Sequence, residues 1–457
     1  MIAMPAATDR NREDEGATRH RRPVTVCPTT RTKDQAVIEP VTLSLPGRRN
    51  FIIGISALGL LSGPAALLGP VARAASAAAV TRRFGADGLA YIGCYTPSPE
   101  TKGTGSGVAL VRLDPRNGAL SLIRTTPMNN ASWIALDRRQ ETLYVLNEDE
   151  VFHDPKAGSV SAYAIDPHDF SLRLLNTVSS GSPVPCYISV HPSGRYLLVA
   201  NYDGGTVSVL PIDPRDGKLR AATSIESDRA ELDPPHAKDN APGNNAVSDH
   251  AGPHMHMIRT DPTGRFVIAV DAGLDRLLIW SLDPSTGRLV PAATPFAALE
   301  PGSAPRHLVF GKGGRILYVV CEQDSVVRSF HFDARTGALT PFQAVGTLPQ
   351  GYAGSNLAAE IVVSPSGRFL YVTQRLHDAI SILRIGEDGS LKLIGETWTR
   401  GDYPRGCAID PHGRFLFSCN QKGDNVTGFR VDPDSGKLSF SGHYLPLGSP
   451  VTMSFLT

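Results

Sequence analysis

A set of ionisable side chains suited to acid–base chemistry and anion binding is spread over the C-terminal half of this sequence. They are His254, His256, Arg306, His307, Glu322, Glu360, Arg375 and Arg405. A neutral imidazole can accept a proton near pH 7. A planar guanidinium suits a carboxylate, a phosphate or a developing oxyanion. Brought together, these groups could activate a water molecule and stabilise an anionic intermediate.

Two other uses of the same residues compete with this interpretation. The three arginines and two glutamates could neutralise one another in a buried ion-pair ring, because unpaired buried charge is costly. His254 and His256 are two residues apart, so on a regular strand they point the same way. A metal site would need a third ligand, and we expect neither a metal nor another cofactor.

Several other chemistries lack their motifs. No Gly-x-Ser-x-Gly elbow occurs, which disfavours a serine hydrolase. The six cysteines form no CxxC or CxxCH motif, which argues against a zinc cluster and excludes covalent haem. The chain has 45 Lys plus Arg against 44 Asp plus Glu, a net charge of +1, so a nucleic-acid partner is not expected.

An internal repeat positions the candidate residues. The segment from Pro185 to Asn201 matches the segment from Pro404 to Asn420. The same frame recurs from Pro253, Ala304 and Ala358, and a more divergent copy starts at Ser132. Each unit reads as a strand, a Pro-x-Gly-Arg turn, a stronger strand, a third strand and an Asp-Pro-x-x-Gly-x-Leu hairpin. Four short antiparallel strands in a period near 45 residues are typical of a β-propeller.

The chain ends predict how the ring closes. Six full units run from Ser132 to about Phe440, and residues 90–115 supply later strands of a further unit without its first strand. The C-terminal segment 449–456 supplies that missing strand. We therefore predict an all-β, seven-bladed propeller in which the N- and C-terminal strands pair in one blade. Residues 221–252 interrupt the period and are expected to form a long loop beside the site.

The repeat predicts where the candidate residues gather. The first strand of each blade lines the central channel, and its start lies at the same end of the blade as the end of the second strand. Those two positions hold almost all the residues above, together with Asn201, Tyr202 and Asp271. We expect one charged channel mouth, which is the default place for a small-molecule site.

The N-terminal region is predicted not to belong to the propeller. Residues 1–47 are polar and charged and are expected to be disordered. Residues 48–77 contain Arg48-Arg49, an apolar run to Leu68 and a small-residue cleavage site near Ala74. This order indicates a twin-arginine export signal. We expect a periplasmic or extracellular protein without a membrane span after cleavage; an uncleaved membrane anchor is the alternative.

These motifs together resemble a known family. The frame and the motifs Gly252-Pro253-His254-Met255-His256, Pro305-Arg306-His307, Ala359-Glu360-Ile361 and Pro404-Arg405-Gly406 are similar to those of the propeller-type lactonases, as are Asn201-Tyr202 and Glu322. That family includes bacterial 6-phosphogluconolactonase and the fungal carboxymuconate lactonizing enzyme. The resemblance covers residues 88–457. Cys321 departs from it, since the family commonly has Asn there.

The resemblance implies a lactone-opening or lactone-closing enzyme that needs no metal. It implies catalytic roles for His256 (or His254), Arg306, Glu322 and Arg375. Substrate contacts are expected from His254, Asn201, Tyr202, Asp271, His307, Glu360 and Arg405. The predicted function is hydrolysis of a small sugar-type lactone, like that of 6-phosphogluconolactonase. The alternatives are a muconate-type lactonizing enzyme and a non-catalytic extracytoplasmic propeller that binds a partner or acts as a scaffold. The oligomeric state is not predicted.

Overall fold

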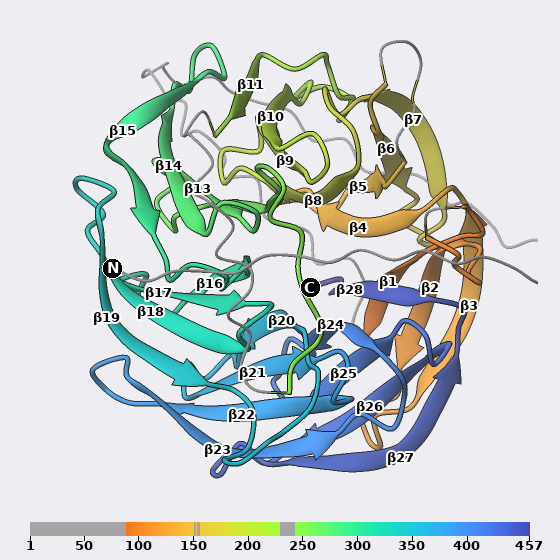
Figure 1. Cartoon of the computed structure of the whole chain (residues 1–457). Helices are drawn as coiled ribbons and strands as arrows, with labels where there is room; N and C mark the ends of the chain where they lie inside the picture. Colours follow the sequence, from red (N-terminus) through yellow and green to blue (C-terminus); the bar gives the residue numbers. More distant parts are fainter. Residues whose placement is uncertain (1–87, 100, 150–151, 153–155, 229–242) are drawn as a thin grey trace, which may run out of the picture. The chain divides into compact units, whose positions relative to one another are not determined.

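The computed structural model describes residues 88–99, 101–149, 152, 156–228 and 243–457. All of them belong to the second of two compact units, Ala79–Thr457. The predicted disordered extension (1–47) and export signal (48–77) lie outside the described residues. The described residues form strands β1 to β28, arranged as seven four-stranded antiparallel sheets (Figure 1). None of their segments is a helix that could cross a bilayer.

Each sheet is one blade, and its strands follow one another from the channel outward. Blade 1 consists of β28 (Pro450–Phe455), β1 (Leu89–Cys94), β2 (Gly107–Leu113) and β3 (Leu120–Pro127). Blade 2 consists of β4 (Ala131–Leu136), β5 (Thr142–Asn147), β6 (Ser159–Ile165) and β7 (Leu172–Ser179). Blade 3 consists of β8 (Pro185–Val190), β9 (Tyr196–Asn201), β10 (Thr206–Pro211) and β11 (Ser224–Ser227). Blade 4 consists of β12 (Met255–Thr260), β13 (Phe266–Asp271), β14 (Arg276–Leu282) and β15 (Leu289–Ala298).

The remaining blades follow the same plan. Blade 5 consists of β16 (Pro305–Phe310), β17 (Ile316–Cys321), β18 (Val326–Phe332) and β19 (Leu339–Gly346). Blade 6 consists of β20 (Ala358–Val363), β21 (Phe369–Gln374), β22 (Ala379–Ile385) and β23 (Leu391–Trp398). Blade 7 consists of β24 (Pro404–Ile409), β25 (Phe415–Asn420), β26 (Asn425–Val431) and β27 (Leu438–Pro446).

The two ends of the described chain share blade 1. The C-terminal β28 pairs antiparallel with the N-terminal β1, with Tyr91 opposite Ser454 and Ile92 opposite Met453. This pairing confirms the predicted seven-bladed propeller and its closure. It also leaves no open sheet edge between the first and last blades, and such an edge would be a liability.

Local chemistry explains the repeated turns. In the Pro-x-Gly-Arg turn of blade 3, the Gly194 N–H donates to the carbonyl of His191, and Gly194 adopts a φ of 69° that favours glycine. In the hairpin that follows β10, a carboxylate oxygen of Asp213 accepts the N–H of Arg215 at 3.0 Å. Each unit therefore turns back on itself with bonds that its own residues supply.

Blades pack through their second and third strands. Every residue of β5, β9, β13, β21 and β25 is buried. Tyrosines on some second strands also bond the hairpin of the next blade: the Tyr144 hydroxyl donates to the carbonyl of Gly217, and the Tyr371 hydroxyl to that of Gly436. Outer strands such as β3 and β15 remain largely exposed. The hydrophobic core thus lies between blades and holds the ring rigid around the channel.

The inner strands are irregular where they begin. The register of each first strand shifts against its partner at the same place, for example between Met255 and Met257 and between Pro305 and His307. A β-bulge re-aims side chains and is common beside functional sites. The bulge does not separate the two histidines, because the rings of His254 and His256 both contact the Tyr202 ring. His254 precedes β12, and the bulge falls on His256.

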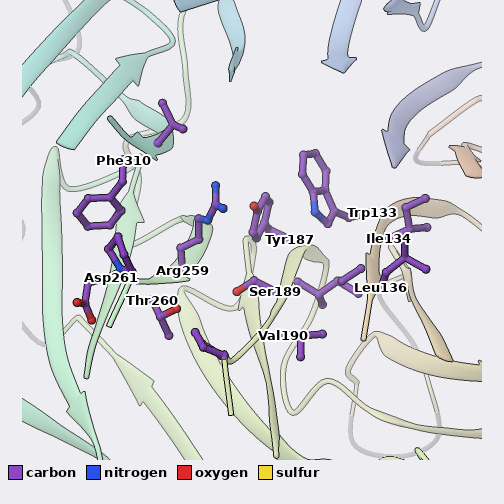
Figure 2. A pocket seen from close by; sticks show the side chains of 15 residues that line it. Trp133, Ile134, Leu136, Tyr187, Ser189, Val190, Arg259, Thr260, Asp261 and Phe310 are labelled. Carbon is purple, nitrogen blue, oxygen red and sulfur yellow. The ribbon is translucent and has the colours of Figure 1, made fainter. Parts of the chain in front are cut away.

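The opposite ends of the inner strands differ from their starts. There, residues of blades 2 to 5 surround a cavity of about 500 Å³ (Figure 2). A second cavity of about 280 Å³ lies along the channel wall and shares Trp133, Tyr187, Arg259 and Val309 with the first. The channel therefore presents two distinct environments, a polar mouth and a far cavity.

Candidate active site

A repeated backbone bond brings the second strands to the mouth. The residue after each second strand donates its N–H to the carbonyl of the residue just before the first strand. Glu322 bonds Ala304 at 2.7 Å, Arg375 bonds Leu357 at 2.9 Å, and Tyr202 bonds Val184 at 2.7 Å. The same position holds Tyr95, Glu148, Ala272 and Gln421 in the other blades. Side chains at this position are therefore directed to the end of the blade at which the bulges occur.

Glu322 lies between two arginines from different blades. Its Oε2 atom is 3.2 Å from Nε of Arg306 and 2.6 Å from Nη2 of Arg375. Nε and Nη2 of Arg375 also lie within 3.4 Å of the carbonyls of Leu357 and Ala358. The Arg306 side chain is only 2% exposed. One carboxylate thus fixes two guanidinium groups and offsets one of their two charges.

Burial in this cluster opposes the charged forms of Glu322 and Arg306, but both groups remain charged near pH 7. Burial tends to raise the pKa of Glu322, but Arg375 and Arg306 outweigh burial and the pKa is lowered. Burial first, and then Arg375 and Arg405, lower the pKa of Arg306 to about 10. Arg306 is therefore still protonated near pH 7, and the carboxylate between the arginines is ionised.

His256 is buried beside these arginines. Burial, followed by Arg306 and His307, lowers its pKa well below 6.5. The imidazole is therefore neutral near pH 7. Its Nδ1 atom is buried and has no hydrogen-bond partner among the described residues. An unpartnered neutral ring nitrogen next to fixed cations is suited to accept a proton from a water molecule.

Tyr202 and His254 form the wall beside His256. The Tyr202 ring stacks on His254 at 4.5 Å and meets His256 edge-on at 5.6 Å. His254 is held by its Nδ1 atom, 3.1 Å from the carbonyl of Tyr202, and by its Nε2 atom, 3.4 Å from Asp249. The Nε2 atom of His254 lies near a carboxylate but makes no hydrogen bond, whereas the unpartnered Nδ1 atom of His256 lies beside the arginines, so His256 is the better placed of the two for proton transfer.

A layer of rings lies beneath the arginines. The Nε2 atom of His307 is 3.4 Å from Nη1 of Arg306, and its Nδ1 atom is 3.0 Å from Oε1 of Glu360. His307 meets Trp133 at 5.3 Å and Tyr187 at 5.4 Å, and these two rings are 4.4 Å apart. Burial, countered by Glu360, lowers the pKa of His307 to about 4. These groups support Arg306 from below.

Arg405 joins the mouth from the other side of the ring. Its guanidinium lies over the Tyr95 ring at 5.4 Å, and the Tyr95 hydroxyl donates to the Glu148 carboxylate at 2.8 Å. Burial opposes its charge, but Tyr95, Glu148 and Tyr403 raise the pKa of Arg405. Tyr95, Glu148 and Tyr403 were not predicted as site residues. The repeat could have identified Tyr95 and Glu148, because both directly follow a second strand, as Glu322 and Arg375 do.

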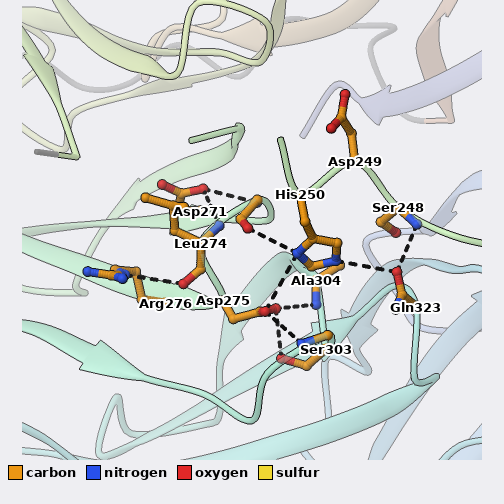
Figure 3. Close-up of polar contacts among 12 residues, drawn as sticks. Ser248, Asp249, His250, Asp271, Leu274, Asp275, Arg276, Ser303, Ala304 and Gln323 are labelled. Carbon is orange, nitrogen blue, oxygen red and sulfur yellow. Dashed lines mark hydrogen bonds and ion pairs between the residues drawn. The ribbon is translucent and has the colours of Figure 1, made fainter. Parts of the chain in front are cut away.

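The segment 243–250 lies over blades 5 and 6. The Ser248 hydroxyl donates to Oε1 of Glu322 at 3.0 Å, and the Ser248 N–H donates to Gln323 at 2.8 Å. His250 lies within 3.6 Å of the Gly273 carbonyl, Gln323 and Asp275 (Figure 3). Part of the long loop predicted beside the site therefore contacts the site directly, and Ser248 is a further residue that sequence reasoning missed.

Two predicted substrate contacts are fully buried and bond within the fold. Asn201 and Asp271 are both 0% exposed. The Asn201 amide donates to the hydroxyls of Thr206 and Ser208 within its own blade. Oδ1 of Asp271 accepts the N–H groups of His254, Gly273 and Leu274. These bonds involve only the Asn201 Nδ2 and Asp271 Oδ1 atoms, and they position neighbouring mouth residues; the other side-chain oxygen of each residue is buried without a hydrogen-bond partner among the described residues.

The remaining predicted residues do converge. His256, Arg306, Glu322 and Arg375 form one cluster with Tyr202 and His254, and His307, Glu360 and Arg405 surround it. The ion-pair alternative is correct in part, because Glu322 pairs with two arginines; among the described residues, Arg405 has no carboxylate within ion-pair distance. Groups of three or more potential metal ligands do not occur in the described ranges.

Fold and site together define a class of protein: a seven-bladed propeller with imidazole, guanidinium and carboxylate groups gathered at one end of its channel. The family model described as "Lactonase, 7-bladed beta-propeller" matches residues 89–455. The chain therefore belongs to the propeller lactonase family.

Individual relatives agree with this assignment. The chain is 28% identical over 370 residues to a 6-phosphogluconolactonase of Bacillus subtilis, covering 80% of this chain and 98% of that protein. It is 32% identical over 273 residues to a 6-phosphogluconolactonase of Pectobacterium carotovorum, covering 60% and 74%. Among solved structures, a periplasmic gluconolactonase of Pseudomonas aeruginosa matches with a TM-score of 0.71 and 28% identity, covering 81% and 99%.

Proposed function

We propose that this protein hydrolyses a small sugar-type lactone at the charged channel mouth. The observation on which the proposal rests most is the cluster of His256, Arg306, Glu322 and Arg375, contributed by three different blades. It combines a neutral imidazole with an unpartnered nitrogen and two fixed guanidinium groups. Lactone hydrolysis requires a base for water and a stabiliser for the oxyanion, and these groups supply both.

In the proposed reaction, His256 accepts a proton from water as the water oxygen attacks the lactone carbonyl carbon. The carbonyl oxygen becomes an oxyanion that Arg306 and Arg375 stabilise. The bond from the carbonyl carbon to the ring oxygen then breaks, and the ring oxygen takes up a proton from the His256 imidazolium. The product is an open-chain hydroxy acid. Glu322 holds the two guanidinium groups in place and Ser248 fixes Glu322.

The names of relatives support the sugar lactone over other lactones. Two relatives are called 6-phosphogluconolactonase, and a solved neighbour is called a periplasmic gluconolactonase. The cationic groups at the mouth would tolerate a phosphorylated substrate as well as an unphosphorylated one. If residues 48–77 direct export, as we propose from their twin-arginine pattern, the substrate is an extracytoplasmic lactone, which favours the unphosphorylated form.

The test is a substrate panel assayed by acid release. The full chain is incubated with glucono-δ-lactone, 6-phosphogluconolactone and a muconate-type lactone, each against its spontaneous rate. We expect saturable hydrolysis of a sugar lactone, abolished in the double variant His256→Ala/Arg306→Ala. Turnover of the muconate lactone alone would favour a lactonizing enzyme. Failure to hydrolyse any of the three would favour a non-catalytic propeller.

A further inference from the structure

We propose a second ligand site at the far end of the channel, for a small organic carboxylate with a flat apolar ring. The site is the cavity of about 500 Å³ that lies between blades 2 and 5, at the ends of the inner strands opposite the mouth (Figure 2). This volume falls in the range of ordinary small-molecule pockets. The proposal is independent of the chemistry at the mouth, because the site uses other residues.

The anion-binding group would be Arg259. It lies near the end of β12, is exposed, and lines both far cavities. Its backbone pairs with Ile268 in the sheet, but its side chain makes no ion pair and no hydrogen bond within the described part of the chain. Figure 2 shows its guanidinium extending into the cavity beside Tyr187. A guanidinium with all its donors available, next to an aromatic ring, is suited to bind a carboxylate in a bidentate manner.

The repeat shows that Arg259 is not a general feature of the inner strands. The fifth residues of the seven inner strands are Ala135, Ser189, Arg259, Val309, Val362, Ala408 and Ser454. Every other member is small or apolar, so the architecture needs no cation at this position. A structural requirement of the propeller therefore does not explain Arg259.

Nearby charges do not occupy this arginine. Asp261 lines the same cavity, but its Oδ1 atom accepts the N–H groups of Arg265 and Phe266, and its Oδ2 atom accepts the N–H and hydroxyl of Thr263. Glu360 lines the smaller cavity, and its Oε1 atom is bonded to His307. Both carboxylates therefore already have partners, and the far cavity has a guanidinium available for a ligand.

The cavity walls select the rest of the ligand. Trp133 and Tyr187 form a tilted aromatic pair with centroids 4.4 Å apart. Phe310, Ile134 and Val309 add apolar surface on one part of the lining, and Ser189, Thr260 and Asp261 add polar groups on another. A flat ring gains contact with aromatic walls, whereas a free phosphate gains nothing from them. The same two aromatic rings contact His307 from below, so they separate the far cavity from the arginines of the mouth.

The experiment titrates the full chain with sodium benzoate and, as an uncharged analogue of the same shape, benzamide. Binding is read from the fluorescence of Trp133 and by calorimetry. We expect saturable benzoate binding and much weaker benzamide binding. Arg259→Gln should raise the Kd for benzoate about tenfold or more, since a charged hydrogen-bonded contact is lost. Arg259→Lys should restore part of the affinity.

Two controls locate the site. Arg306→Gln changes the mouth and should leave benzoate affinity unaltered. Trp133→Phe should remove the fluorescence change while calorimetry still detects binding. Unsaturable binding, equal Kd values for wild type and Arg259→Gln, or loss of binding in Arg306→Gln would each overturn the proposal. Thermal unfolding of each variant is measured alongside to show that it is folded.

Discussion

The same seven inner strands build both ends of the channel, yet the two ends differ in how they hold charge. At the mouth, bulges and cross-blade bonds hold arginines against Glu322, His307 and Tyr95. At the far end the strands are regular, and Arg259 occupies a position that is small or apolar in every other blade. Charge fixed by several blades is preorganised, which favours chemistry at a developing anion. A guanidinium without an ion-pair partner in the protein, such as that of Arg259, is available to bind an anion from solution.

The first prediction contrasts one arginine from each end. Arg306→Ala and His256→Ala should each lower kcat/KM for the preferred lactone by roughly a hundredfold or more, because each removes a transition-state contact. Arg259→Ala is the matched far-end variant and should leave kcat/KM unchanged. Steady-state assays of all three, with thermal unfolding as a folding check, measure the contrast. Equal losses at both ends would refute the assignment of chemistry to the mouth.

The second prediction concerns the carboxylate that fixes the mouth. Glu322→Gln leaves two buried guanidinium groups without their counter-charge, so the free energy of unfolding at pH 7 should fall by about 3 kcal/mol. Urea unfolding measures it, and the exposed Glu387→Gln serves as control with no expected change. Because the pKa of Glu322 is lowered on folding, its contribution exists above the pKa of the unfolded chain and disappears as the pH falls through the folded-state pKa.

The difference between wild type and Glu322→Gln should therefore shrink in acid. If the difference in unfolding free energy stayed constant well below pH 4.5, the ionised carboxylate would not be what stabilises the pair of arginines.

The third prediction is the pH dependence of the base. The pKa of His256 is well below 6.5, so its neutral form persists as the pH falls past the value at which an ordinary histidine is protonated. The kcat/KM profile should therefore stay level through pH 6.5 and fall only at more acid pH. A pH–rate profile measures this. An inflection near pH 6.5 would show that His256 does not act as a buried, neutral base.

The mildest loss should come from the 243–250 segment. Ser248→Ala removes one hydrogen bond to Glu322 and should lower kcat/KM about fivefold, with KM little changed, since a bond of this kind contributes about 1 kcal/mol. Ser355→Ala removes a bond to the same segment, at Asn245, away from Glu322. It should have less effect than Ser248→Ala. If Ser355→Ala lost as much activity as Ser248→Ala, the position of the whole segment would matter for activity, and not the single bond from Ser248 to Glu322.

Much of the fold could be predicted because the repeat consists of turns and hairpins that neighbouring residues form by themselves. The Pro-x-Gly-Arg turns and Asp-Pro hairpins form their own bonds, so their spacing counts the blades. The first strand that the N-terminal unit lacks, and that segment 449–456 supplies, predicts the closure. The functional roles were harder to predict. Asn201 and Asp271 have the right residue types at the right repeat position, but they bond within their own blade. Ser248 lies in a loop outside the repeat, and nothing in its surroundings in the sequence marks it.

The order of residues along the chain specified most of the residues that reach the mouth, because a repeat places equivalent positions at equivalent heights around the ring; Ser248 lies outside the repeat. Tertiary packing then selected which of those residues face one another and which bond within the fold. It also made His256 neutral and kept Glu322 ionised. Those properties depend on burial and on the distance to charges from other blades, which the sequence does not specify.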